Sequence, residues 1–169
     1  MIQLSPPPLP PWEGLHPLVV HFPIALLLTV PLFVLLGLLP RVGAGIRIAA
    51  LVLMVVGTVA AYVAVETGEA AGRLADRSDA VERVLEQHEE LAETTRTAVT
   101  VLTAVYAAGL ALPFVLRRTV RRGKVLPPAV PIIATVLFVA FWIGACLLLA
   151  NTGHLGGRLV HELGVRALQ

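Results

Sequence analysis

The chain has 169 residues, of which 57% are hydrophobic and 14% are charged, and its mean hydropathy is +0.84. A soluble domain carries roughly 25% charged residues, so this composition excludes an ordinary water-soluble enzyme and predicts an integral membrane protein. The net charge of +2 does not indicate a nucleic-acid partner, because the basic residues cluster at the ends of apolar runs. The single cysteine, Cys146, excludes a disulfide framework.

The chain begins with a proline-rich stretch, 1–15, which we expect to form an extended arm before a membrane domain at 16–169. The first predicted span is 18–39, because about 20 apolar residues are needed to cross a bilayer. Pro23 removes one helical hydrogen bond near the start of this span, so we expect the helix to kink or loosen there. His21 falls inside that turn, and an ionisable residue at such a place suggests a functional site.

Three further spans are predicted, at 45–65, 97–116 and 131–150. The segment 79–96 is charged, but its apolar residues recur at helical spacing and no helix breaker separates it from the third span. We therefore expect the third helix to run on beyond the bilayer as a rod of roughly 55 Å. A break or cap is expected near Gly153, after the fourth span. The predicted fold class is an all-α, integral membrane four-helix bundle.

The orientation follows from the distribution of basic residues. The loops 41–47 and 117–124 together carry seven Lys and Arg residues and no acidic residue, whereas the N-terminal arm carries neither Lys nor Arg. The positive-inside rule therefore predicts that these two loops are cytoplasmic and that both termini lie outside.

This orientation places all the histidines in the external half of the bundle: His16, His21, His88, His154 and His161. From the helical rise, we expect His21 and His154 to face each other near the membrane boundary, with His16 and His88 in a layer above them. His154 and His161 share a helix face but differ by about 10 Å in height, too far to bind the same metal ion.

Two acidic residues at the outer end of the second span are candidates for supporting these histidines. Glu66 and Glu69 could accept a hydrogen bond from the second ring nitrogen of a ligating imidazole. Each histidine alone has an ordinary interpretation as a hydrogen-bonded packing residue. The convergence of three helices at one level, with His21 in the membrane, favours a shared site.

Four motifs along the chain resemble those of a known bacterial family. They are H-P-x-x-V-H-F-P-I at 16–24, Glu-Thr-Gly at 66–68, a histidine at 88, and G-H-L-G-G-x-L-V at 153–160. They resemble the four-helix membrane family catalogued as domain of unknown function 2231, over nearly the whole chain. The resemblance implies a multi-pass module of the bacterial cytoplasmic (inner) membrane, sometimes fused to or encoded near redox proteins.

The resemblance also implies site residues. The positions that match the family motifs are His16, His21, His88 and His154. The family motif continues after Val160 with Tyr and, two residues later, His, whereas this chain has His161 and Leu163. The chain departs from the family at His161.

The first functional hypothesis is a b-type haem protein with one or two haems near the external face. His21 and His154 would form one axial pair, and His16 and His88 are candidates for a second site. The implied activity is electron transfer between a membrane quinol and an external electron carrier or redox partner subunit. Such a chain would be an electron-transfer or accessory subunit rather than a stand-alone enzyme.

Two alternatives stay open. One is a Cu or Zn site whose ligands come from among the five histidines, with Glu66 or Glu69 as a further candidate ligand. The other is a non-catalytic subunit of a membrane complex, whose long third helix recognises a partner. Besides membrane lipid, a second copy of the chain is a candidate partner, and no hydrolytic triad or phosphate-binding loop is visible in the sequence.

Overall fold

The computed structural model describes residues 8–119 and 129–165. Every regular element in these ranges is helical: η1 (Trp12–Gly14), α1 (His16–Val19), α2 (His21–Leu36), α3 (Gly43–Gly72), α4 (Asp79–Thr119) and α5 (Ala129–His161). Four helical stretches are long and apolar enough to cross a membrane, with α1 and α2 together forming the first. The predicted all-α fold with four membrane-spanning helices is thus confirmed.

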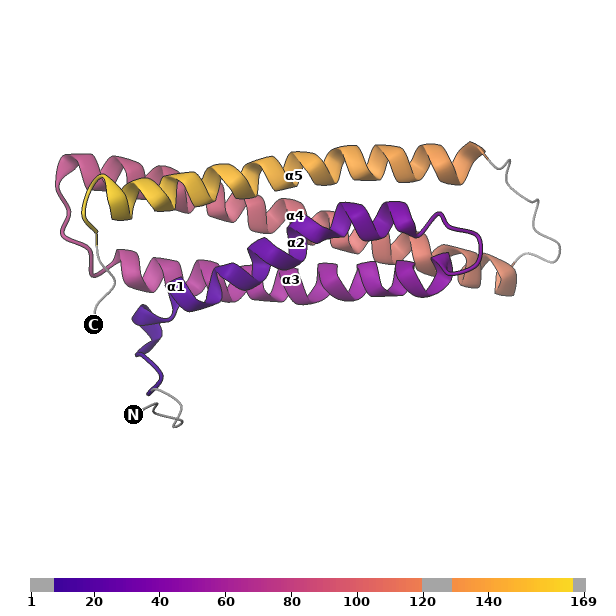
Figure 1. The fold of residues 1–169 in the computed structure, drawn as a ribbon, viewed down its shortest axis with the longest axis horizontal. Coiled ribbons are helices and arrows are strands. Elements are labelled where there is room, and N and C mark those ends of the chain that lie inside the picture. Colours follow the sequence, from indigo (N-terminus) through magenta and orange to yellow (C-terminus); the bar gives the residue numbers. More distant parts are fainter. Residues whose placement is uncertain (1–7, 120–128, 166–169) are drawn as a thin grey trace, which may run out of the picture.

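The helices form two antiparallel hairpins that lie side by side (Figure 1). In the first hairpin α2 packs mainly against α3, and in the second α4 packs mainly against α5. The segment 73–78 joins α3 to α4 at the end of the bundle where both described chain ends also lie. This end contains η1, α1, the end of α3, the start of α4 and the end of α5. We call it the histidine end, because all five histidines of the chain lie there.

The first helix is interrupted at Val20, between α1 and α2. Pro23 has no N–H to donate to the carbonyl of Val19, and the next hydrogen bond, from Ile24 N to Val20 O, is stretched to 3.4 Å. The kink predicted around Pro23 is therefore present, one turn before the proline. As a result His16 stands on a separate single turn of helix.

The third and fourth spans are longer than their apolar parts. The helix α4 runs without interruption from Asp79 to Thr119, as predicted for 79–116. The expected break near Gly153 is wrong, because α5 continues to His161 and ends only where Gly164 adopts a φ of 70°. A glycine inside an apolar helix keeps its backbone hydrogen bonds, because water is not there to compete for them. Residues 120–124 of the predicted basic loop lie outside the described residues.

A buried tryptophan supplies a hydrogen bond that α2 cannot form by itself. Pro31 cannot donate to the carbonyl of Leu27, which would otherwise accept the N–H four residues later. The indole N–H of Trp142, on α5, donates to this carbonyl instead, at 3.0 Å, and the Trp142 side chain is completely buried. The hydrogen bond therefore joins the two hairpins at mid-height and satisfies a carbonyl that the proline left unpaired.

We expect Trp142→Phe to lower the free energy of unfolding by about 1–3 kcal/mol, because the buried Leu27 carbonyl would keep only the long, weak hydrogen bond from the Cys146 thiol, at 3.9 Å. Pro31→Ala is the matched control, because it restores the N–H in α2 that this carbonyl lacks. In the Pro31→Ala background Trp142→Phe should cost clearly less. Unfolding in detergent of the wild type, the two single variants and the double variant measures the coupling between the two positions. Equal costs of Trp142→Phe in both backgrounds would show that the tryptophan does not compensate for Pro31.

Candidate functional site

Two half-buried histidines meet between the hairpins at the histidine end. His16 comes from α1, in the first hairpin, and His88 comes from α4, in the second. Their ring centroids are 6.4 Å apart and their ring planes are nearly perpendicular, at 89°. The structure thus brings together the two histidines that we predicted to share the upper layer.

Each imidazole is held through its Nδ1 atom by a backbone carbonyl. His16 Nδ1 lies 2.9 Å from the carbonyl oxygen of Ala64 on α3, and His88 Nδ1 lies 2.9 Å from that of Thr152 on α5. A carbonyl oxygen only accepts hydrogen bonds, so each Nδ1 carries a hydrogen and donates it. In the neutral rings the lone pair is therefore on Nε2. This is the tautomer in which histidine binds a metal through Nε2 while Nδ1 holds the ring in place.

A glycine one turn beyond each carbonyl makes room for the ring. A Cβ atom at Gly68 would lie 3.0 Å from Cε1 of His16, and one at Gly156 would lie 3.1 Å from Cε1 of His88. Both distances are shorter than ordinary carbon contacts, so a side chain at either position would press on the imidazole. The two hairpins thus use the same device: a carbonyl, and four residues later a glycine, hold a histidine from the neighbouring helix.

Two clefts adjoin the histidine pair. The first, with an empty volume of about 670 Å³, extends toward the middle of the bundle and is lined by Pro23, Ala61 and Leu149 among others. The second, of about 820 Å³, extends the other way, toward Leu74 and Val165. His16 and His88 line both clefts. The pair therefore stands between two largely apolar clefts.

The electrostatics of the site favour a neutral imidazole at His88, which lies in the charged part of α4 that we place outside the membrane. Burial lowers the pKa of His88, the hydrogen bond with Thr152 partly opposes this effect, and the neighbouring His16 lowers the pKa further. Beside it, burial raises the pKa of Glu89, and the nearby Glu69 carboxylate raises that pKa as well. His88 thus keeps a lone pair available for a ligand to lower pH than an exposed histidine would.

The other predicted site residues are placed differently. His21, His154 and His161 are exposed and line neither cleft, so the predicted pairing of His21 with His154 stays a prediction. Glu69 lines the first cleft together with His16 and His88. Glu66 is exposed and pairs with Arg96 instead of with a histidine. The groups that hold the imidazoles are backbone carbonyls rather than these two carboxylates.

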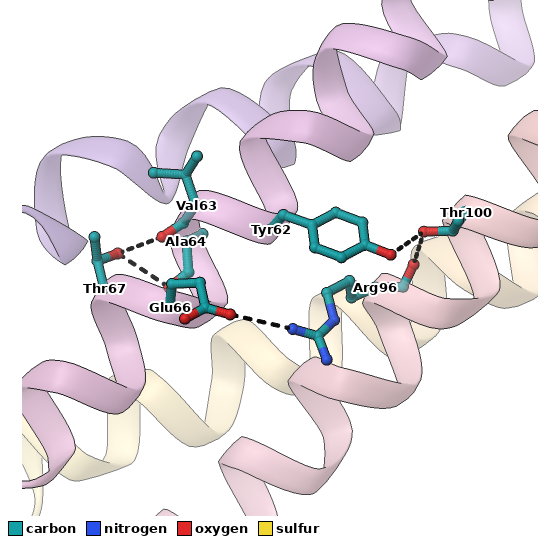
Figure 2. A network of polar contacts seen from close by, with 7 residues as sticks. All are labelled: Tyr62, Val63, Ala64, Glu66, Thr67, Arg96 and Thr100. Atoms are coloured by element: carbon teal, nitrogen blue, oxygen red, sulfur yellow. Dashed lines mark hydrogen bonds and ion pairs between the residues drawn. The ribbon is translucent and has the colours of Figure 1, made fainter.

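An arginine that the sequence patterns did not single out also lines the first cleft. Arg96 on α4 lies 3.9 Å from the Glu66 carboxylate and stacks over the Tyr62 ring, 5.1 Å from its centroid (Figure 2). Tyr62 and Glu66 are four residues apart on α3, which places both side chains on one helix face beside Arg96. The spacing of Tyr62 and Glu66 can be seen in the sequence, but the sequence does not show that Arg96 of α4 packs beside them.

Among residues 8–119 and 129–165, no group of three or more His, Cys, Asp or Glu side chains is arranged to hold a metal ion. The candidate site is therefore a pair of imidazoles with two adjoining clefts.

Comparison with curated proteins and with solved structures gives no significant match. Residues 13–169 match the family described as "Predicted membrane protein (DUF2231)". The matched range contains every helix from α1 to α5 and both histidines of the pair. The family suggested by the sequence motifs is thereby confirmed, and the chain belongs to this family of predicted membrane proteins.

Proposed function

We propose that the chain is a membrane-embedded haem protein, in which His16 and His88 are the two axial ligands of one b-type haem. The observation that carries the proposal is the spacing of the two rings. A metal bound to two imidazoles lies about 2 Å from each nitrogen, and each ring centre is about 1 Å further out, so the centroids should be about 6 Å apart. The observed separation is 6.4 Å.

The donor set agrees with this ligand. The porphyrin ring supplies four nitrogen ligands itself, so two neutral imidazoles, whose Nδ1 atoms are already hydrogen-bonded, would complete the coordination of its iron through Nε2. A Cu or Zn ion bound by the protein alone would take one or two further protein ligands. Glu69 and Glu89 line the same cleft as both histidines, and they are the candidates for such further ligands.

The space around the pair suits a flat, apolar ligand. A plate centred between His16 and His88 and perpendicular to the line that joins them would reach into both clefts. Its faces would lie between the hairpins, where the packing of α2 against α5 and of α3 against α4 is less extensive than packing within each hairpin. The bound group would supply one-electron chemistry. The protein's part would be to hold it, exclude water and place it near one face of the membrane.

We infer a role as an electron-transfer or accessory subunit rather than as a stand-alone enzyme. If the basic loops are cytoplasmic, the histidine end faces outward and lies close to an external electron carrier. A membrane quinol is the proposed donor, since the first cleft reaches into the apolar part of the bundle.

The absorption spectrum of the full chain, purified in detergent after expression with haem available, tests the proposal. We expect a Soret band that shifts on reduction, and one haem per chain by pyridine haemochrome assay. Metal analysis of the same sample separates haem iron from Cu or Zn. A well-folded preparation without colour, even after haem is added, would rule the proposal out.

The pH dependence of haem binding provides a further check. Because burial lowers the pKa of His88, its Nε2 lone pair should survive to a pH below the ordinary histidine value of about 6.5. We therefore expect haem to remain bound as the pH falls through 6.5 and to be released only at lower pH, when the ring is protonated. A titration of the Soret band measures this. Release centred above pH 6.5 would contradict a buried neutral ligand.

A further inference from the structure

The charged side chains of the first cleft are segregated by height. Glu69 and Glu89 stand level with the histidine pair, where Arg73 and Arg77 also act on Glu89. Arg96 lies eight residues beyond His88 on α4, about 12 Å deeper along the helix axis. Within this cleft the two carboxyl groups therefore lie level with the histidine pair, and Arg96 lies deeper.

Among the described residues, the side-chain partners of Arg96 are Glu66 and Tyr62, and neither engages the guanidinium strongly. The contact with Glu66 is long, at 3.9 Å, and the Glu66 side chain is 60% exposed, so this ion pair contributes little. The Tyr62 ring supports the guanidinium from one face without accepting its N–H groups in their plane (Figure 2). A guanidinium has five N–H donors and binds carboxylates in a bidentate manner.

We propose that Arg96 binds a carboxylate of the ligand, so that the acidic edge of the haem faces the crevice between α3 and α4. This inference rests on the proposed function, and it adds the orientation of the ligand and the class of group that anchors it. To meet across the rise of about 12 Å between His88 and Arg96, a propionate and the arginine side chain would each extend toward the other. Glu69 and Glu89 disfavour the opposite orientation, because it would place like charges side by side.

Arg96 is only 21% exposed, and this burial strengthens the interaction. A charge-assisted hydrogen bond in a partly desolvated cleft is stronger than one at the surface. The stacking of the guanidinium over the Tyr62 ring restricts it before the ligand arrives, which reduces the conformational entropy lost on binding. The polar network in Figure 2 is thus a support for one anion-binding side chain.

Two porphyrins that differ only at the acidic edge test this orientation. Haem and haem dimethyl ester have the same iron and ring, but the ester has no carboxylates. Cofactor-free full-length protein in detergent is titrated with each, and Arg96→Gln is compared with the wild type. We expect the wild type to prefer haem over the ester, and Arg96→Gln to weaken haem binding by about tenfold while leaving ester binding unchanged.

Arg83→Gln is the matched control, because Arg83 is an exposed arginine on the same helix and lines neither cleft. It should keep the wild-type preference, and Arg96→Lys should keep part of it. Using the ratio between the two porphyrins cancels their different partitioning into detergent.

The outcomes separate the two proposals. If the wild type binds neither porphyrin with a ligated-iron spectrum, the proposed function fails. If both porphyrins bind and Arg96→Gln keeps the full preference for haem, the haem proposal stands and Arg96 is only an interfacial anchor. Circular dichroism of each variant shows whether it is folded.

Discussion

Alanine at His16 or at His88 is expected to abolish stable haem binding, whereas alanine at His21 or His154 should leave it intact. In the proposed site each ring of the first pair would supply one Nε2 atom, so losing either would remove half of the protein's ligands. We expect haem affinity to fall by more than about 100-fold. The reduced-minus-oxidised spectrum of the four single variants is the measurement.

His21→Ala and His154→Ala are matched controls for this prediction, because both residues lie at the same end of the bundle but are exposed and outside the clefts. Loss of haem in these two variants, with retention in His16→Ala and His88→Ala, would reverse the assignment and support the lower pair. Retention in all four would show that no histidine pair ligates the iron.

The second large effect is expected from Gly156→Ala and Gly68→Ala. The added Cβ would lie 3.1 Å from Cε1 of His88 or 3.0 Å from Cε1 of His16, so the imidazole must shift away from the carbonyl that holds it. A ring that loses its Nδ1 partner is poorly oriented, and such losses weaken metal binding by about 10- to 100-fold. Haem titration of the purified variants measures this.

Gly157→Ala provides the control, since Gly157 lines neither cleft and a Cβ there meets nothing within 4 Å. Alanine favours the helix over glycine by about 1 kcal/mol at all these sites, so the helical gain is the same in test and control. The control variant should bind haem like the wild type. Equal losses of haem affinity in Gly156→Ala and Gly157→Ala would show that contact of the added Cβ with the His88 ring is not the cause.

The helices themselves were predictable because their causes are local. Apolar runs of sufficient length mark the spans, and the uninterrupted helix from Asp79 to Thr119 follows from a stretch without breakers. Gly153 was misleading because glycine breaks helices in water, where the backbone has other partners, and much less in an apolar bundle.

The site was predictable only in part. Helical rise places His16 and His88 at similar heights, and the structure brings them together. Their partners could not be read in advance, because Ala64 and Thr152 contribute carbonyl oxygens, which every residue has. The contact between Trp142 and Leu27 joins residues 115 positions apart, and only Pro31 indicates that a carbonyl there needs a donor.

The hairpin arrangement has a consequence for assembly. Each hairpin contributes one histidine of the His16–His88 pair, and the segment 73–78 is the short covalent link from α3 to α4. If this link were cut, two fragments would result, each with two helices long and apolar enough to cross a membrane and with one of the two proposed iron ligands. If the two fragments bind haem when they are co-expressed but not when each is expressed alone, haem absorbance would report directly on the assembly of the two hairpins.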